Sequence, residues 1–505
     1  MEQAEGFIRK NKFYLAALAG YAFLFLFLCS KMSPLYVSNE WSDVNIYFTI
    51  GQSIINGKTL YVDVFDPKGP LIFIIYGIGY LISNDSFIGL FLFFLIGWSA
   101  ALTLIFYLTD YLLNSKPLAL AVAAFTPPFA LSYMHSGGSP EEIILLLHLF
   151  CISLLVKSDR LQIKRREFAV LGACSAAVIC LKFNLIFFLA ISTIALFYIT
   201  YLSGRKKAFW QQVLFFIAGV SAIFIPVCAY LVATGAFGAT IDTYIILNKK
   251  LAVTVPFVQL IKDGVKRILA MFTYYPVGAT VIFLGAFIYP LLYLKRILLK
   301  VSYILGALSL YGIIFFAGVA QFYYPLPLYV FLPLGLIVII KFFKIDRLRV
   351  NRLAEMSIVC IAILLCAYRI QFWNMSLDQL LRKEPLPGLN YAFAKIINEE
   401  PNPTLLSLTY GDAVNVFTLC NITPNVKYFS SLNIPYEIYP VLRNEQVRYI
   451  ADKEVQFIII NEQARFFANL DVLHQNYEVV GRYAGLEEYQ NVRFPKTALL
   501  YKRKD

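Results

Sequence analysis

Long apolar runs separated by short basic clusters constrain this chain more than any other feature of its sequence. Hydrophobic residues make up 59% of the 505 positions and charged residues only 15%, whereas soluble domains carry about 25% charged residues. An apolar run of about 20 residues can cross a bilayer as a helix. We therefore predict an all-α polytopic membrane protein with eleven spanning helices, near residues 13–32, 87–110, 117–134, 141–157, 168–184, 185–203, 209–233, 272–294, 301–320, 325–341 and 354–371.

The basic clusters favour this topology. The net charge of +13 could indicate a nucleic-acid partner, but most of the excess lies between apolar runs, as the positive-inside rule describes. We expect no nucleic acid. Eleven crossings place every cluster in the cytoplasm, namely 9–12, Lys116, 157–166, 205–207, 295–300 and 341–352. The apolar segment 70–83 would reverse this arrangement if it crossed, so we predict an interfacial or re-entrant helix there.

The same topology places four loops and the C-terminal region outside. The loops are 33–86, 135–140, 234–271 and 321–324. We predict a membrane domain over residues 1–371 and a small extracytoplasmic α/β domain over 372–505, because the latter contains β-rich runs (TLLSLTY, VQFIII, TALLYK) between turn signals. The eight cysteines form no CxxC pair, so we expect neither a disulfide framework nor a zinc site.

The first outer loop holds the main candidate site. Ser42 is expected to N-cap a helix that runs from Asp43 to about Asn56 and stops at Gly57. Its apolar and polar faces predict an amphipathic helix lying on the membrane. Asp43 falls in the first turn, where the helix dipole favours an ionised carboxylate. Such a group can act as a general base, although complementing the dipole would also explain it.

Asp63, Asp66 and Lys68 follow in the sequence TLYVDVFDPKGPL. Pro67 and Pro70 stiffen the backbone on both sides of the lysine. A fixed ammonium at headgroup level is suited to binding a phosphate, while an ordinary snorkelling lysine is the alternative.

The second outer loop contains two adjacent glutamates in HSGGSPEEIILLL. Ser139 and Glu142 match a capping box with Pro140 at the first helical position. This role accounts for Glu142, and glutamine would serve it equally well. Glu141 has no such role, and we predict that it is a second acidic residue of the site.

Three further residues lie near the outer boundary. Lys182, at the end of the fifth predicted span, is a functional candidate because lysines are rare in membrane helices. Tyr323 and Tyr324 are interfacial tyrosines that either belong to the aromatic belt or stack on a sugar ring.

These residues resemble the motifs of the GT-C glycosyltransferases, in particular the bacterial branch with the protein mannosyltransferases and the aminoarabinose transferase. The likeness rests on Asp43, on the G-x-x-x-Y-x-D run from Gly57 through Tyr61 to Asp63, and on Lys68–Gly69–Pro70. It extends more weakly to Glu141 and to Tyr324–Pro325. Valine follows Asp43 where the family often has glutamate, and Gly69 replaces the first proline of its Lys-Pro-Pro step.

The resemblance implies a polyprenyl-phosphate sugar donor, an acceptor that is a glycan, lipid or protein, and inverting transfer on the outer face of a bacterial plasma membrane. It implies that Asp43 is the catalytic base and that Lys68 binds the donor phosphate. We predict Lys182 as a second residue that binds this phosphate. Glu141 would be a second catalytic acid, and Tyr61, Asp63, Asp66, Tyr323 and Tyr324 would contact substrate. No cofactor is required, and a divalent metal on Asp43 and Glu141 stays an open alternative.

Three rival functions stay open at the level of sequence. A transporter or flippase of lipid-linked oligosaccharides would line a path through its helices with charges, but here the acids gather in the outer loops. A polysaccharide polymerase is expected to rely on arginines in large outer loops, and the 234–271 loop has only Arg267. A non-catalytic scaffold would retain function without Asp43.

Overall fold

The computed structural model describes residues 2–36, 39, 41–159, 163–252, 255–318, 320–347, 352–368, 388–410, 413–461, 467, 470–489 and 492–504. The chain divides into two compact units. The first unit contains residues 1–33, 91–227 and 252–372, and the second contains 34–90, 228–251 and 373–505. The predicted boundary at 371/372 lies outside the described residues, and the two-domain division stays a prediction.

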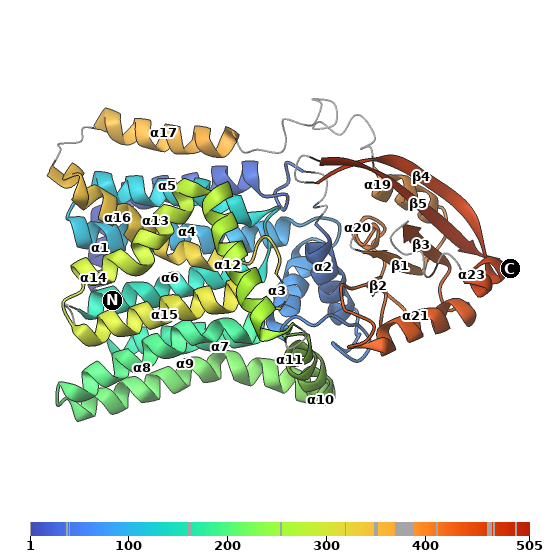
Figure 1. Cartoon of the computed structure of the whole chain (residues 1–505), viewed down its shortest axis with the longest axis horizontal. Coiled ribbons are helices and arrows are strands. Elements are labelled where there is room, and N and C mark those ends of the chain that lie inside the picture. Colours follow the sequence, from blue (N-terminus) through green and yellow to red (C-terminus); the bar gives the residue numbers. More distant parts are fainter. Residues whose placement is uncertain are drawn as a thin grey trace. The chain divides into compact units, whose positions relative to one another are not determined.

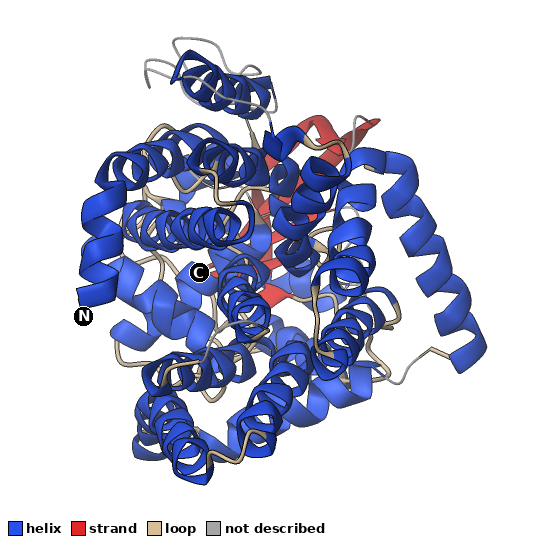
Figure 2. Cartoon of the chain, turned by 90° about the vertical axis from the view of Figure 1, so that its left-hand side faces the viewer, coloured by secondary structure: helices blue, strands red, loops and turns tan. Residues whose placement is uncertain are grey.

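The first unit is a helical bundle. Most of its helices are seen nearly end on in Figure 2, so their axes share a common direction. They are α1 (Glu2–Cys29), α4 (Ile88–Leu113), α5 (Lys116–Met134), α6 (Pro140–Ser158), α7 (Arg165–Lys182), η1 (Phe183–Ile186), α8 (Phe187–Leu202), α9 (Lys206–Ala233), α12 (Phe257–Tyr274), α13 (Pro276–Phe283), η3 (Leu284–Ile288), α14 (Tyr289–Tyr293), α15 (Ile297–Phe315), η4 (Leu326–Phe331), α16 (Leu332–Phe342), η5 (Ile345–Arg347) and α17 (Arg352–Tyr368).

Apolar helices confirm a multi-pass membrane protein. Seven helical stretches among the described residues are long and apolar enough to cross a bilayer, and an eighth counts if a bent pair at 237–274 forms one span. The predicted spans at 325–341 and 354–371 correspond to shorter apolar helices, and the second of them ends outside the described residues. The count of eleven stays a prediction. The segment 70–83, predicted as a non-crossing helix, forms the short helix α3 (Pro70–Ile82).

The stretch from 165 to 202 reverses direction within the bundle. The rings of Phe168 and Phe197 stack with their centres 4.9 Å apart. Residues 29 positions apart in one straight helix would be separated by about 43 Å at 1.5 Å per residue. The chain therefore turns back through η1, so that α7 and α8 form an antiparallel helical pair, as the separate predictions for 168–184 and 185–203 require.

The second unit joins the first outer loop to the C-terminal region. Its helices are α2 (Ser42–Ile55), α3, α10 (Phe237–Thr240), η2 (Ile241–Leu247), α11 (Asn248–Ala252), α19 (Leu389–Ile397), α20 (Asn415–Leu419), α21 (Pro440–Ala451) and α23 (Asp471–Asn476). The predicted outer loop 234–271 is thus largely helical. Helices α2 and α3 pack closely, because Gly51 has no side chain that would collide with the backbone of Tyr76 and Gly77.

A five-stranded sheet forms the core of the C-terminal region (Figure 1). Its order is β2-β1-β3-β5-β4, with β1 (Leu405–Tyr410), β2 (Ser430–Ser431), β3 (Phe457–Asn461), β4 (Tyr477–Tyr489) and β5 (Val492–Arg503). Strand β1 is parallel to β2 and β3, whereas β5 is antiparallel to β3 and β4. The three β-rich runs predicted from the sequence correspond to β1, β3 and β5.

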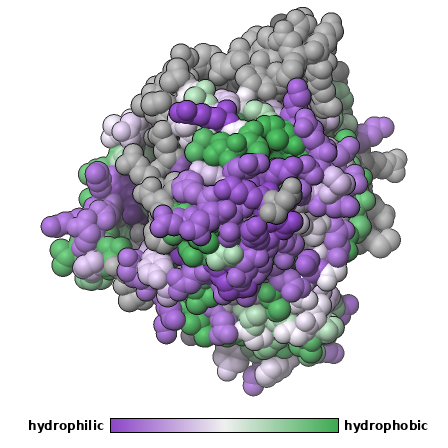
Figure 3. Space-filling model, turned by 90° about the vertical axis from the view of Figure 1, so that its right-hand side faces the viewer, coloured by the Kyte–Doolittle hydropathy of each residue, from purple (hydrophilic) through white to green (hydrophobic). Residues whose placement is uncertain are grey.

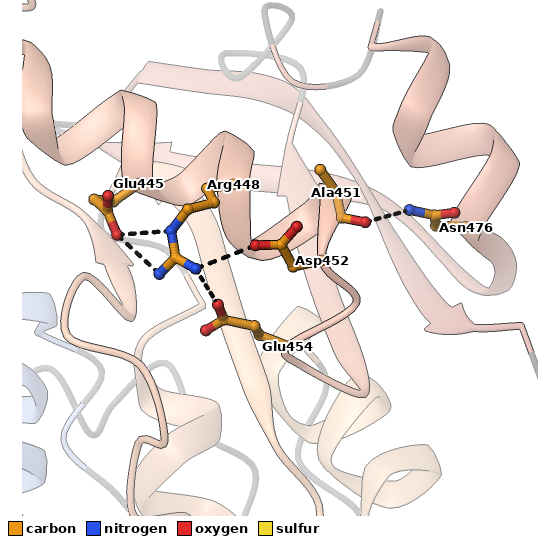
Figure 4. Close-up of polar contacts among 6 residues, drawn as sticks. All are labelled: Glu445, Arg448, Ala451, Asp452, Glu454 and Asn476. Carbon is orange, nitrogen blue, oxygen red and sulfur yellow. Dashed lines mark hydrogen bonds and ion pairs between the residues drawn. The ribbon is translucent and has the colours of Figure 1, made fainter.

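The surface of this region is polar. The face seen in Figure 3 is mostly hydrophilic. On α21, Arg448 forms ion pairs with Glu445, Asp452 and Glu454 (Figure 4). Exposed ion pairs of this kind contribute little stability, but they are typical of a surface in contact with water.

Candidate active site

Helix α2 places Asp43 in its first turn, but it begins differently from the prediction. Trp41, not Ser42, occupies the N-cap position, and it makes no side-chain capping bond. The amide of Asn45 instead donates to the carbonyl oxygens of Asn39 (2.6 Å) and Trp41 (2.8 Å). This bonding from inside the helix fixes its start without a capping hydroxyl. Gly57, with φ +88°, ends the helix as predicted.

Helix α2 is buried rather than spread on a membrane. Ten consecutive residues, Val44 to Ser53, are buried. Its polar side chains bond to the C-terminal region: Asn45 accepts from Thr418 (2.8 Å), and Gln52 donates to the side chain of Asn421 (2.9 Å). The prediction of an amphipathic surface helix is therefore wrong, since its polar face is covered by protein.

The carboxylate of Asp43 is half-buried beside polar and aromatic groups. The hydroxyl of Tyr47 donates to its Oδ2 across 3.4 Å, a long and weak hydrogen bond. The ring of Tyr47 is fixed in turn by edge contacts with Phe73 and Tyr76 of α3. Asp43 is thus positioned by a rigid pair of helices.

Lys68 lies in a turn that is held at several points. The side chain of Asp66 accepts from the backbone N–H of Lys68 (2.9 Å), closing an Asx turn around Pro67. The hydroxyl of Tyr61 donates to the Lys68 carbonyl (2.6 Å), and Asn248 donates to the Pro67 carbonyl (2.7 Å). These bonds fix the backbone from which the half-buried Lys68 side chain extends.

Burial gives Asp66 an unusual titration. The carboxyl is buried, and this desolvation raises the pKa of Asp66 to about 6, with Lys68 lowering it and the charge of Asp43 raising it further. Asp43 is therefore close enough to Asp66 to act on it electrostatically. The second unit thus brings Asp43, Asp66 and Lys68 into one site.

Two of the predicted substrate contacts have local structural roles. Asp63 accepts from the backbone N–H of Thr59 (2.7 Å), which closes the turn before the site. Tyr61 is fully buried and adopts φ +64°, a left-handed conformation that is uncommon for a residue other than glycine. Its hydroxyl supports the backbone of Lys68. Direct contact of Asp63 or Tyr61 with a substrate stays a prediction.

The sequence did not indicate Lys427, which the fold brings to the same turn. Its ammonium lies 5.9 Å from the ring centre of Phe65. The ring of Phe65 stacks on Tyr439, with centres 5.3 Å apart. These two residues are more than 360 positions apart in the chain, so no sequence pattern predicts their contact.

A second cluster, in the first unit, joins three other predicted residues. Lys182 forms an ion pair with Glu141 across 2.7 Å, and its ammonium lies 3.4 Å from the centre of the Tyr324 ring. Glu141 is 1% exposed, and its second oxygen has no hydrogen-bond partner among the described residues. Such a buried carboxylate depends on its lysine for charge balance. Tyr323, next in the chain to Tyr324, is also buried.

Glu142 has a larger role than the predicted capping box. Ser139 accepts from the backbone N–H of Glu142 (3.1 Å), as predicted. The Glu142 carboxylate, however, accepts from Gly138 N–H (2.8 Å) and from the indole of Trp98 (2.6 Å). Both of its oxygens receive donors, so glutamine cannot replace it without turning an NH2 group toward an N–H. The structure therefore gives Glu142 contacts that the capping box did not predict, and the equivalence of glutamine does not follow from them.

Gly137 allows a close approach of the second outer loop to the end of α1. It has φ +83°, and a side chain there would collide with Ser30. The backbone N–H of Lys31 also donates to the Ser136 carbonyl (2.9 Å). The second outer loop is therefore fixed against the end of α1.

The two acidic candidates belong to different units: Asp43 to the second and Glu141 to the first. Among the described residues, no group of three or more His, Cys, Asp or Glu side chains is arranged to hold a metal ion. The alternative of a divalent metal on Asp43 and Glu141 stays a prediction.

The fold is that of the GT-C membrane glycosyltransferases, which confirms the expected class of fold. Two crystal structures of ArnT from Cupriavidus metallidurans, one bound to undecaprenyl phosphate and one in the apo state, are similar to the chain. Their TM-scores are 0.57 and 0.56, both at 10% sequence identity. The first alignment covers 98% of each chain, and the second covers 99% of this chain and 98% of ArnT.

The arabinofuranosyltransferase AftD from Mycobacteria aligns at a TM-score of 0.44 and 12% identity, over 97% of this chain and 40% of AftD. No protein-family model matches the sequence, and no curated protein sequence matches it.

Proposed function

We propose that the chain is a membrane glycosyltransferase that transfers a sugar from a polyprenyl-phosphate donor to a glycan, lipid or protein acceptor on the outer face of the membrane. The observation that carries this proposal is the joining of Asp43, Asp66 and Lys68 in one site. A base and a phosphate-binding cation are the two groups that such a transfer needs. The fold shared with ArnT, which has been crystallised with undecaprenyl phosphate, supports the choice of donor.

Asp43 is the proposed general base of an inverting displacement. The acceptor hydroxyl attacks the anomeric carbon of the donor and passes its proton to the Asp43 carboxylate. The bond between the anomeric carbon and the phosphate oxygen breaks, and the phosphate leaves with the electron pair. Lys68 neutralises the charge that develops on the leaving phosphate.

Glu141 and Lys182 are proposed to act as a pair. Because the ammonium of Lys182 contacts Glu141 and the face of Tyr324, its first role is to orient the buried Glu141. The free oxygen of Glu141 would then accept a hydrogen bond from a sugar hydroxyl. Binding of the donor phosphate by Lys182 would require a break in this pair.

The proposal is tested by Asp43→Asn in purified protein supplied with a polyprenyl-phosphate sugar. The amide keeps the shape of the side chain but cannot take a proton, so transfer should fall on the order of 100-fold or more while donor binding persists. Asp85→Asn is a matched control, because Asp85 is an exposed residue of the same outer loop that bonds to Ser83. Retention of more than about a tenth of the rate in Asp43→Asn would contradict a general base.

A further inference from the structure

In the turn that carries Lys68, the aromatic side chain of Phe65 packs against the C-terminal region. Phe65 is buried, stacks on Tyr439 with an interplanar angle of 4°, and meets the edge of Tyr428 with ring centres 5.0 Å apart. The hydroxyls of the two tyrosines are hydrogen-bonded across 2.8 Å. The aromatic cluster formed by Phe65, Tyr428 and Tyr439 thus fixes this part of the C-terminal region beside the site.

The ammonium of Lys427 lies against this aromatic cluster. Its ammonium is 5.9 Å from the centre of Phe65 and 5.5 Å from that of Tyr428. It is half-buried, and within the described part of the chain it forms no hydrogen bond or ion pair. Asp63 and Glu445 act on it only at longer range, and burial lowers the pKa of Lys427 despite them. An ammonium has three donors, and no described residue accepts a hydrogen bond from that of Lys427.

We propose that Lys427 is the second cation of the phosphate site begun by Lys68 and that it binds the polyprenyl phosphate released by transfer. The inference rests on the proposed function. Lys68 leaves the turn closed by Asp66, and Lys427 packs on Phe65 of the same turn. Ammoniums that belong to and pack on the same turn would suit a single phosphate, which has several acceptor oxygens.

The charge of the phosphate explains why a second cation would serve this reaction. The donor is a phosphodiester with one negative charge. When the bond from the anomeric carbon to the phosphate oxygen breaks, the phosphate keeps the electron pair and becomes a monoester, whose charge at neutral pH is about −1.5 to −2. A cation whose interaction strengthens as this charge grows stabilises the transition state more than the bound donor.

The test is a binding titration on the purified full-length chain in detergent. The probes are undecaprenyl phosphate, which is a monoester, and its methyl ester, which is a diester like the donor. Lys427→Met keeps the apolar stem on the aromatic cluster and removes the charge. We expect it to weaken monoester binding roughly 10- to 150-fold, which is the range of a charge-assisted hydrogen bond, and to weaken diester binding clearly less.

Three variants make the result interpretable. Lys427→Arg retains a cation and should recover most of the affinity, which also shows that the site is folded. Lys395→Met removes an exposed lysine of α19 and should change nothing. Lys68→Ala should weaken both probes.

An unchanged monoester affinity in Lys427→Met, or equal weakening of monoester and diester, would overturn the inference while Lys68→Ala still supported the proposed function. Absence of undecaprenyl phosphate binding to the wild type would count against the proposed function itself. Competition by inorganic phosphate at millimolar concentration would support recognition of the phosphate group, whereas equal competition by phosphatidylglycerol would show a general anionic-lipid surface and overturn the assignment.

Discussion

The carboxylates of the first outer loop differ in how their oxygens are used. Asp63 and Asp66 each accept from a backbone N–H within their own turn, whereas Asp43 accepts from the side-chain hydroxyl of Tyr47. A residue that closes a turn has a structural reason to be acidic or amidic. These environments therefore separate a candidate base from two acids that shape the loop.

Asp66→Asn is expected to alter how stability depends on pH. The folded-state pKa is raised to about 6 from an ordinary value near 3.8. Between these values the unfolded chain releases the proton and the folded chain keeps it, so wild-type stability falls as pH rises from about 4 to about 6. Asparagine keeps the bond to Lys68 N–H and has no charge to desolvate. The variant should melt at a higher temperature than the wild type at pH 7.5, by an amount equivalent to roughly 1–3 kcal/mol.

The same measurement at about pH 3 provides the internal control for Asp66. Wild type and variant should melt at similar temperatures there, since the carboxyl is then mostly protonated in both the folded and the unfolded wild type. A constant difference between the two proteins at both pH values would mean that titration of Asp66 is not the cause.

Glu142→Gln is expected to lower stability. One of its two terminal atoms becomes an NH2 group that faces either the indole N–H of Trp98 or the N–H of Gly138. A buried donor left without an acceptor costs about 1–3 kcal/mol. Thermal unfolding in detergent measures the loss.

Glu141→Gln is the matched neighbour, because its remaining oxygen can still accept from Lys182. It should lose transfer activity with a smaller loss of stability. If Glu142→Gln lost activity and Glu141→Gln lost stability, Glu142 would be the functional residue and Glu141 the structural one.

At the scale of elements, the sequence predicted where most helices and strands lie but not what covers them. Helix α2 ends at Gly57 as expected, and the β-rich runs became β1, β3 and β5. The predicted N-cap at Ser42 failed because Asn45 holds the start of the helix from within. The sequence predicted that the polar face of α2 would contact water or lipid headgroups. Its actual partners are more than 360 positions away in the chain, so no local sequence pattern indicates them.

Thr418→Val tests whether this polar contact stabilises α2. The change leaves the buried Asn45 Oδ1 without its donor, so we expect a loss of about 1–2 kcal/mol in the free energy of unfolding. Thr423→Val is the control, since Thr423 accepts from Asn56 at an exposed position and accepts only a long bond from Gln52, whose amide keeps its shorter bond to Asn421. It should cost under about 0.5 kcal/mol. Equal losses in the free energy of unfolding for the two variants would indicate that the buried bond to Asn45 stabilises the protein no more than the exposed bond does.

At the scale of the whole molecule, hydropathy predicted a membrane bundle followed by an α/β region, and the GT-C fold agrees with both. It did not predict that residues 34–90 group with residues 373–505 in one compact unit. The contacts responsible, such as those of Phe65 with Tyr428, join aromatic residues that look alike in any apolar sequence. The charges of the first outer loop therefore indicated a candidate site, whereas the proximity of Lys427 to Phe65 left no signal in the sequence.

Orientation in the membrane is the prediction on which the outer placement of the site depends. Positive-inside clusters put residues 157–166 in the cytoplasm and the C-terminal region outside. In a chain without its native cysteines, a membrane-impermeant maleimide added to intact cells should label Pro440→Cys, which lies at the exposed start of α21, but not Ile163→Cys. Permeabilised cells should show labelling at both positions, which controls for accessibility. Labelling of Ile163→Cys in intact cells would reverse the topology and place Asp43 and Lys68 on the cytoplasmic side, where transfer to an outer acceptor could not occur.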